Sequence, residues 1–123
     1  MKVYLPIQEK VIKDGVLVKT PGEKEFDLDM SVAGQMRFEA KFPELAERED
    51  LFGYSKRICA EKKATGAIIL SKMKMLYCWF DTDLSFVEFL KMFDLADIEY
   101  STKLTDKIHE IFKLIFDSSA EKN

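Results

Sequence analysis

The sequence predicts an α+β fold that is mostly α, with an N-terminal β hairpin or meander followed by a bundle of about four helices. Runs of β-branched residues and period-two alternation occur in the first thirty residues, which is typical of strands. Hydrophobic residues then recur every three to four positions, which is typical of amphipathic helices. With 123 residues, 47% of them hydrophobic, the chain can bury one core. We therefore expect one domain over residues 1–123, with a hairpin region at 1–30, a helical region at 31–117 and a frayed tail at 118–123.

The strand predictions depend on turn residues. Two β-branched runs flank Asp14-Gly15, the dipeptide favoured in a two-residue type I′ turn because both central positions need a positive φ. Residues 20–23 contain Pro-Gly and predict a further turn. Residues 26–30 alternate hydrophobic and acidic side chains, which predicts a third, half-buried strand.

The helix predictions follow in chain order. Ser31 is a plausible N-cap for a first helix, and Pro43 either limits this helix or starts a short second piece. A long central helix is expected over residues 54–80. Ser85 and Glu88 have the spacing of a capping box and begin a short amphipathic helix. The last helix, over residues 102–116, has a continuous apolar stripe: Leu104, Ile108, Ile111, Phe112 and Ile115.

The central helix is predicted to be apolar on two faces. At 100° per residue, one face carries Ile58, Ile69, Met73, Leu76 and Phe80, and we assign it to the core. The second stripe consists of Ile68, Met75 and Trp79. Two interpretations of this stripe stay open: burial inside the monomer, or an exposed surface for a partner or for self-association. In the second interpretation, Ile68, Met75 and Trp79 are the candidate partner-binding residues.

No pattern in the sequence indicates catalysis, a cofactor or a metal site. His109 is the only histidine, so a histidine-based metal cluster or catalytic relay within one chain lacks its parts. Phosphate loops, dinucleotide fingerprints and zinc spacings are missing, and the carboxylates lie in no recognisably apolar context. Cys59 and Cys78 are too far apart on one helix to form a disulfide, and with the lack of a signal peptide they indicate intracellular synthesis. We expect a binding protein and no enzyme.

Charge restricts the class of partner. The net charge is −3, whereas a nucleic-acid-binding domain usually has a basic excess. Six basic residues lie between Lys56 and Lys74, however, so a small nucleic-acid-binding regulator is kept as an alternative. Residues 81–99 are correspondingly acidic, which predicts two neighbouring helices with complementary edges. No apolar run approaches the ~20 residues of a membrane span, so no membrane association is expected.

The order of these elements resembles the tail assembly chaperones of long-tailed bacteriophages. The resemblance covers roughly residues 24–116: the hairpin, a helix opening with Met36-Arg37-Phe38-Glu39, the long apolar helix, Phe86-Val87-Glu88-Phe89-Leu90, and the closing helix. It consists of hydrophobic and acidic patterns, and no catalytic motif takes part.

The resemblance implies a function in tail morphogenesis. Such a chaperone binds the long helical tape measure protein, keeps it soluble in the host cell cytoplasm, helps to recruit tail tube protein, and leaves without entering the virion. Abundant Phe and Met fit the adaptable apolar contact that this task needs. A structural tail or head-tail joining component that stays in the particle is the remaining alternative.

Overall fold

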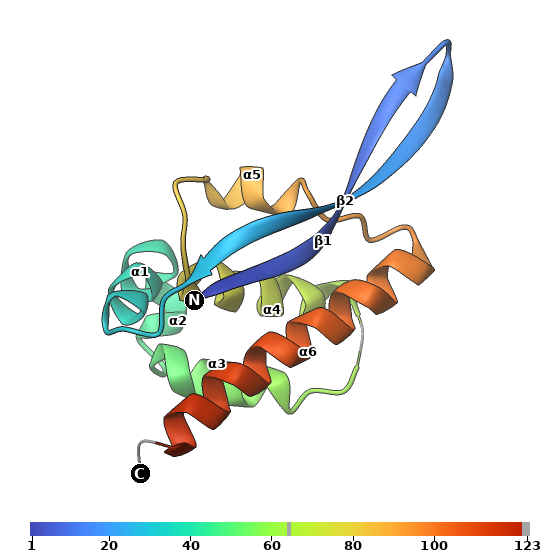
Figure 1. Ribbon diagram of the computed structural model, residues 1–123. Helices are drawn as coiled ribbons and strands as arrows, with labels where there is room; N and C mark the ends of the chain where they lie inside the picture. Colours follow the sequence, from blue (N-terminus) through green and yellow to red (C-terminus); the bar gives the residue numbers. More distant parts are fainter. Residues whose placement is uncertain (64, 122–123) are drawn as a thin grey trace.

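A computed structural model describes the backbone of residues 1–63 and 65–121 and the side chains of 1–63 and 65–117. It confirms the α+β, mostly α, fold with an N-terminal β hairpin (Figure 1). The elements in order are β1 (Lys2–Lys13), β2 (Val16–Leu28), α1 (Ala33–Lys41), α2 (Pro43–Ala46), α3 (Leu51–Cys59), α4 (Gly66–Trp79), β3 (Phe80–Asp81), α5 (Phe86–Leu90) and α6 (Ile98–Glu121). α6 continues to Glu121, past residue 118, from which a frayed tail is predicted, and residues 122–123 lie outside the described part.

β1 and β2 form one long antiparallel hairpin. Its turn is Asp14-Gly15, with φ of 51° and 76°, as predicted for a turn that needs two positive φ angles. The turn predicted at residues 20–23 is wrong, because β2 continues through Pro21, which pairs with Gln8 of β1. The separate strand predicted at residues 26–30 is instead the end of β2.

A short third strand joins the hairpin to the helices. β3 pairs antiparallel with the end of β2, with Asp27 opposite Asp81 and Leu28 opposite Phe80, so the sheet order is β1-β2-β3. The end of the hairpin next to β3 packs on the helical body, while the turn end projects away from it (Figure 1). The hairpin is therefore part of the core at one end and solvated at the other.

The single helix predicted over residues 54–80 is wrong, because the chain forms two helices there, α3 and α4. α3 ends at Cys59, and Thr65 caps the start of α4, its hydroxyl accepting a hydrogen bond from the N–H of Ile68 at 3.3 Å. Gly66, which has a low helix propensity, is the first residue of α4. A capping Thr followed by Gly favours a new helix start over helix continuation.

Aromatic side chains fill the core where the sheet meets α5. Phe26 of β2 stacks on Phe80 of β3, with ring centroids 4.7 Å apart. Phe89 of α5 contacts both rings edge-on, at 5.5 Å and 6.1 Å. Offset stacking and edge-to-face packing are the favourable geometries for aromatic pairs. Three elements distant in sequence are thereby held together by three rings.

The interpretation of the second stripe as an exposed partner-binding surface is wrong for Met75 and Trp79. Met75 has no exposed area, Trp79 is 7% exposed, and Ile68 is half-buried. The indole Nε1 of Trp79 donates to Ser55 Oγ of α3 at 3.0 Å, which satisfies its polar group inside the core. The two stripes are both buried because α1, α3 and α5 all contact α4. Of the two interpretations, burial in the monomer applies.

Gly34 allows α1 to approach α4 closely. A Cβ at this position would lie 3.3 Å from Leu51 Cδ2 and 3.6 Å from the Trp79 ring. A side chain there would therefore press on Leu51 at the start of α3, while it would only reach ordinary contact with the indole.

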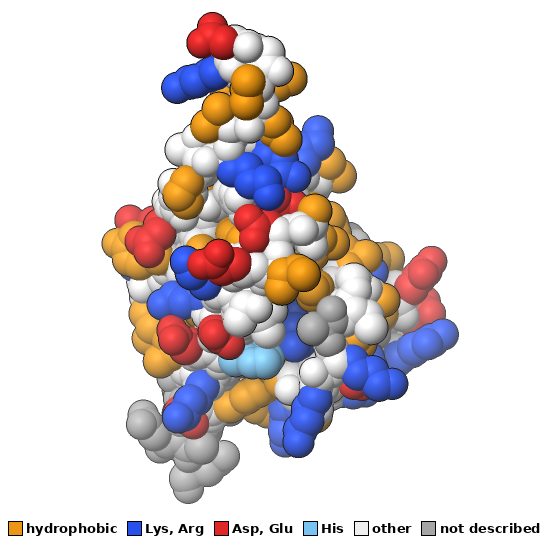
Figure 2. Space-filling view, turned by 90° about the vertical axis from the view of Figure 1, so that its right-hand side faces the viewer, with side chains coloured by type: hydrophobic (Ala, Val, Ile, Leu, Met, Phe, Trp, Pro, Cys, Tyr) orange, Lys and Arg blue, Asp and Glu red, His pale blue; other side chains and the backbone are white. Residues whose placement is uncertain are grey.

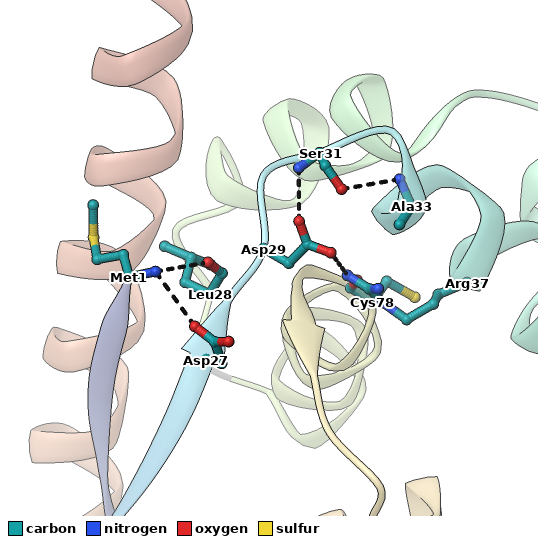
Figure 3. Close-up of polar contacts among 8 residues, drawn as sticks. All are labelled: Met1, Asp27, Leu28, Asp29, Ser31, Ala33, Arg37 and Cys78. Atoms are coloured by element: carbon teal, nitrogen blue, oxygen red, sulfur yellow. Dashed lines mark hydrogen bonds and ion pairs between the residues drawn. The ribbon is translucent and has the colours of Figure 1, made fainter.

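Polar contacts fix the turn between β2 and α1 (Figure 3). Asp29 accepts from the N–H of Ser31 at 2.9 Å, and the Ser31 hydroxyl accepts from Ala33 N–H at 3.2 Å. Arg37 of α1 donates to Asp29 Oδ2 at 3.1 Å and to the Cys78 carbonyl at 2.9 Å. The hydrogen bonds from Ser31, reinforced by the Arg37 guanidinium, lower the pKa of Asp29. Arg37 thus links the hairpin end to the C-terminal turn of α4.

The burial of Trp79 predicts a large loss of stability on truncation. Trp79→Ala is expected to lower the free energy of unfolding by about 3 to 5 kcal/mol, because it leaves a cavity and removes the N–H that donates to Ser55 Oγ. Val87→Ala is the matched control, since Val87 lies exposed on α5, and it should change stability by less than about 0.5 kcal/mol. Urea unfolding followed by circular dichroism measures both. Equal stability of the two variants would contradict the burial.

Candidate partner-binding surface

The turn end of the hairpin, residues 11–18, forms an arm that carries exposed apolar side chains. We call it the distal arm. Every residue from 9 to 25 is exposed, and Ile12 and Leu17 are 73% and 56% exposed. The exposed apolar side chains of the arm are Val11, Ile12, Val16, Leu17 and Val18. Figure 2 shows hydrophobic side chains along the projecting arm. Exposed apolar residues gathered in one place commonly mark a binding site.

The distal arm is apolar on both of its faces. Cross-strand partners share a face, and successive residues alternate faces. Ile12 therefore shares a face with its partner Leu17, and Val11 shares the other face with its partner Val18. A strand with apolar residues on both faces is normally buried on both sides. Neither face is covered here.

Ion pairs hold the arm in position over the body. Lys10 and Lys19, two cross-strand pairs before Ile12 and Leu17, share their face. Lys10 Nζ lies 3.1 Å from Asp94 Oδ2, and Lys19 Nζ lies 3.5 Å from Asp97 Oδ2. Both carboxylates belong to the segment between α5 and α6. The sequence predicted that acids of residues 81–99 would complement the basic segment 56–74, but Asp94 and Asp97 pair with the hairpin instead.

Hydrogen bonds lower the pKa values of Asp94 and Asp97, the two carboxylates that we call the Asp94–Asp97 anchor. The Ala96 N–H, aided by Lys10, lowers the pKa of Asp94, and the Tyr100 N–H, aided by Gln8, lowers the pKa of Asp97. Both carboxylates are therefore charged at neutral pH and can form the ion pairs that orient the arm.

The outer edge of β1 is covered where the hairpin leaves the body. The N–H of Gln8 donates to the Met92 carbonyl at 3.2 Å, and the Tyr100 hydroxyl donates to the Pro6 carbonyl at 2.6 Å. Backbone groups on one antiparallel strand alternate between the partner strand and the outside. On β1, the residues whose backbone groups point away from β2 are therefore Pro6, Gln8 and every second residue beyond them. We call these the outward positions.

Prolines occupy outward positions on both strands of the hairpin. Pro6 lies two residues before Gln8, and Pro21 is the cross-strand partner of Gln8, so both occupy positions whose backbone groups face outward. Proline has no backbone N–H, so neither position offers an outward donor. A missing outward donor weakens the addition of another strand, which is how natural sheet edges avoid unwanted pairing. Both prolines lie outside residues 11–18, so they restrict strand addition at the base of the arm.

A groove opens in the body below the arm. It has a volume of about 320 Å³ and lies between the start of α4 and the start of α6. Ile98 is 84% exposed at its rim. Its lining residues are Ile69, Leu95, Ile98, Ser101, Thr102, Thr105 and Asp106. The groove combines apolar side chains with hydroxyl groups on one wall.

The arm and the groove form one surface. Lys10 and Lys19 contact Asp94 and Asp97, and Leu95 between these acids lines the groove. The hairpin face with Ile12 and Leu17 is therefore the one that faces the 94–97 segment at the base of the arm, and the arm projects beyond it (Figure 1). We call these five residues, Ile12, Leu17, Ile69, Leu95 and Ile98, the arm–groove surface. Its chemistry suits non-covalent binding of an apolar partner.

The arm–groove surface contains no residue of the candidate stripe. Met75 and Trp79 belong to the core, and half-buried Ile68 lies next to groove residue Ile69. One sequence signal was available: Val11-Ile12 and Val16-Leu17-Val18 put consecutive apolar residues beside a tight turn, which makes both faces of a hairpin apolar. The pattern predicts strands, but it says nothing about the distance between the turn and the body.

A separate titratable cluster lies between α4 and α6. Lys72, only 3% exposed, has its Nζ 3.1 Å from His109 Nε2. Burial lowers the pKa of Lys72, and burial together with the Lys72 charge lowers the pKa of His109, while Asp106 opposes the latter shift. Burial raises the pKa of the neighbouring Cys59 thiol to about 12, so that thiol is a poor nucleophile at neutral pH. The cluster packs α4 on α6 and offers no activated group.

Across residues 1–63 and 65–117, no three His, Cys, Asp or Glu side chains are placed to hold a metal ion. No helix in the described part of the chain is both long and apolar enough to cross a membrane.

Comparisons of the chain with protein-family models, curated proteins and solved structures find no match.

The Lys72–His109 contact predicts a pH-dependent stability. The folded protein protonates His109 at a lower pH than the unfolded chain does, so the unfolded state binds more protons as the pH falls below about 6.5. The free energy of unfolding should therefore decrease between pH 7.5 and pH 5.5, as measured by urea unfolding. No other histidine contributes. His109→Gln and Lys72→Met should both reduce this decrease, and an unchanged decrease in His109→Gln would contradict the assignment.

The Asp94–Asp97 anchor predicts a locally loosened arm in the double variant Asp94→Asn with Asp97→Asn. Amide hydrogen exchange at Gln8 should become faster, because its segment loses the ion pairs that hold it against Met92, while exchange in α4 stays slow. In the wild type the same change should occur as the pH falls below about 4, because both pKa values are lowered and the charges are lost only there. Glu99→Gln, an exposed neighbour, is the control. Equal exchange in all three proteins would count against the anchor.

Proposed function

We propose that this protein is a phage tail assembly chaperone that binds the tape measure protein without covalent chemistry. It acts in the host cell cytoplasm, keeps its client soluble, helps to recruit tail tube protein and does not enter the mature virion. The proposal rests on the resemblance in element order together with one structural observation, the exposed arm–groove surface.

The arm–groove surface supports binding of a helical client. Ile12 and Leu17 are directed toward the side of the body where Leu95 and Ile98 line the groove, so an apolar segment can contact both. An amphipathic helix places its apolar residues on one stripe and needs no backbone hydrogen bonds from its receptor. At the base of the hairpin, Pro21 and the covered edge at Pro6 and Gln8 disfavour the competing mode, in which the client adds a strand. The groove hydroxyls can accommodate the polar margin of such a helix.

The nucleic-acid alternative has weaker support from the side chains. Of the six basic residues between positions 56 and 74, Lys72 is buried, and Arg57 is paired with Glu49 at 2.6 Å. Lys74 lies over the Phe42 ring, with Nζ 5.8 Å from the ring centroid. These three contribute little to a free basic surface.

The second alternative is a structural tail or head-tail joining component that stays in the particle. Mass spectrometry of purified virions would detect such a component, whereas a chaperone would be absent from them.

Co-expression with the tape measure protein tests the proposal. Wild-type protein should increase the soluble fraction of the tape measure protein, as judged by centrifugation and gel densitometry. The variant Ile12→Asp with Leu17→Asp should lose most of this effect, because two charges replace the apolar centre of the arm. Both residues are exposed, so the fold should persist, which circular dichroism checks.

Val87→Asp is the matched control, because it puts a charge on an exposed valine outside the arm–groove surface, on α5. It should solubilise the client as the wild type does. A tape measure protein that stays insoluble with the wild type would overturn the function. A solubilising effect that survives the arm variant would instead overturn the assigned surface.

A further inference from the structure

We propose that the groove between the start of α4 and the start of α6 binds an apolar segment that carries a lysine or arginine, and that Asp106 selects for this cation. The chemical class of the ligand follows from the groove alone, whereas its place on the client helix rests on the proposed function. The groove then adds charge selectivity to a surface whose other contacts are apolar.

The apolar part of the groove accommodates the hydrocarbon groups of such a segment. Ile69 comes from α4, Leu95 from the segment before α6, and Ile98 from the first turn of α6. They lie together where α6 runs across α4 (Figure 1). Leu95 and Ile98 are 56% and 84% exposed, so a hydrocarbon group that covers them removes apolar area from water.

The polar wall of the groove offers acceptors and few donors. A hydroxyl group has one hydrogen and two lone pairs. Ser101 Oγ donates its hydrogen to the Asp94 carbonyl at 3.3 Å, and Thr102 Oγ1 donates to the carbonyl one turn earlier at 3.0 Å. Both oxygens can then only accept, as the ionised Asp106 does. Among the described lining side chains only Thr105 can still donate, so the wall suits an ammonium or guanidinium group better than an anion.

Asp106 is the only charged side chain on the described lining of the groove. It is exposed and forms no ion pair with a described side chain. The pKa of His109, on the next turn of α6, is lowered, so His109 is neutral at pH 7 and does not neutralise this carboxylate. The start of a helix disfavours a cation only within its first turn, and Asp106 lies about two turns beyond Ile98.

The spacing along α6 favours a helical segment as the ligand. Ile98, Thr102 and Asp106 follow one another at intervals of four residues, so they lie along one side of α6 over about 12 Å. A client helix beside α6 can place an apolar residue at Ile98 and a cation one to two turns further, at Asp106. The groove therefore recognises the order of an apolar and a cationic residue.

Titration of the full chain with n-hexylammonium, followed by amide chemical shifts, tests the ligand class. The shifts should saturate and should be largest from Ser101 to Asp106. The affinity should be about threefold higher than for n-hexanol, which has the same stem without the charge, and n-hexanoate should bind more weakly than n-hexanol. Shifts that do not saturate at the groove, or equal affinities for the ammonium and the alcohol, would overturn the proposal.

Two variants separate the charge from the apolar contact. Asp106→Asn should reduce the affinity for n-hexylammonium to that for n-hexanol, and Ile98→Ser should weaken binding of both. Asp83→Asn removes an exposed carboxylate outside the groove, so it is the matched control and should keep the threefold preference. All three residues are exposed, so the fold should persist, which circular dichroism checks. A preference that survives Asp106→Asn would contradict the role of this residue.

Co-expression of the variants with the tape measure protein tests the place of the cation on the client. Asp106→Lys should reduce the soluble fraction of the client to less than half of that with the wild type, whereas Asp106→Glu and Asp83→Asn should preserve it. A wild type that solubilises the client no better than Asp106→Lys does would remove the client cation from the proposal. A wild type that does not solubilise the client at all contradicts the proposed function, and the titration with n-hexylammonium still decides the ligand class.

Discussion

The burial of the C-terminal half of α4 is the constraint on which the rest of the structure depends. Met75 and Trp79 on one stripe and Leu76 on the other are all inside the core, so α4 needs neighbours on several sides. The chain continues from Trp79 directly into β3, which pairs with the end of β2 and brings Phe80 against Phe26. The same helix therefore positions the helical body and the base of the hairpin. The direction in which the arm leaves the body follows from this junction and from the Asp94–Asp97 anchor.

Local signals predicted the elements whose causes are local. Asp14-Gly15 forms the expected turn because positive φ angles are a property of those two residues. The stripe of α6 is buried as expected, since its spacing alone defines one apolar side. The Ser85 hydroxyl accepts the Glu88 N–H at 3.1 Å, as its spacing predicts. In each case a few neighbouring residues determine the outcome.

Predictions that depended on distant neighbours were wrong. Periodicity continued across Thr65-Gly66, although capping at that point separates two helices. Pro21 was interpreted as part of a turn. Whether a strand tolerates a proline depends on the direction of its partner's backbone groups, and Gln8 directs its N–H away from Pro21, to the Met92 carbonyl. The burial of Trp79 depends on Ser55 and Gly34, which no helical wheel includes. For the same reason the sequence indicated apolar strands but not the arm–groove surface, which exists only because the hairpin is longer than the side of the body that it covers.

The arm combines two features that act in opposite directions on association. Five exposed apolar side chains favour contact with other molecules, whereas Pro21 and the lysines beside the arm restrict strand addition at its base. Affinity for a partner therefore has to come mainly from side-chain burial, which requires a partner of matching shape and so increases selectivity.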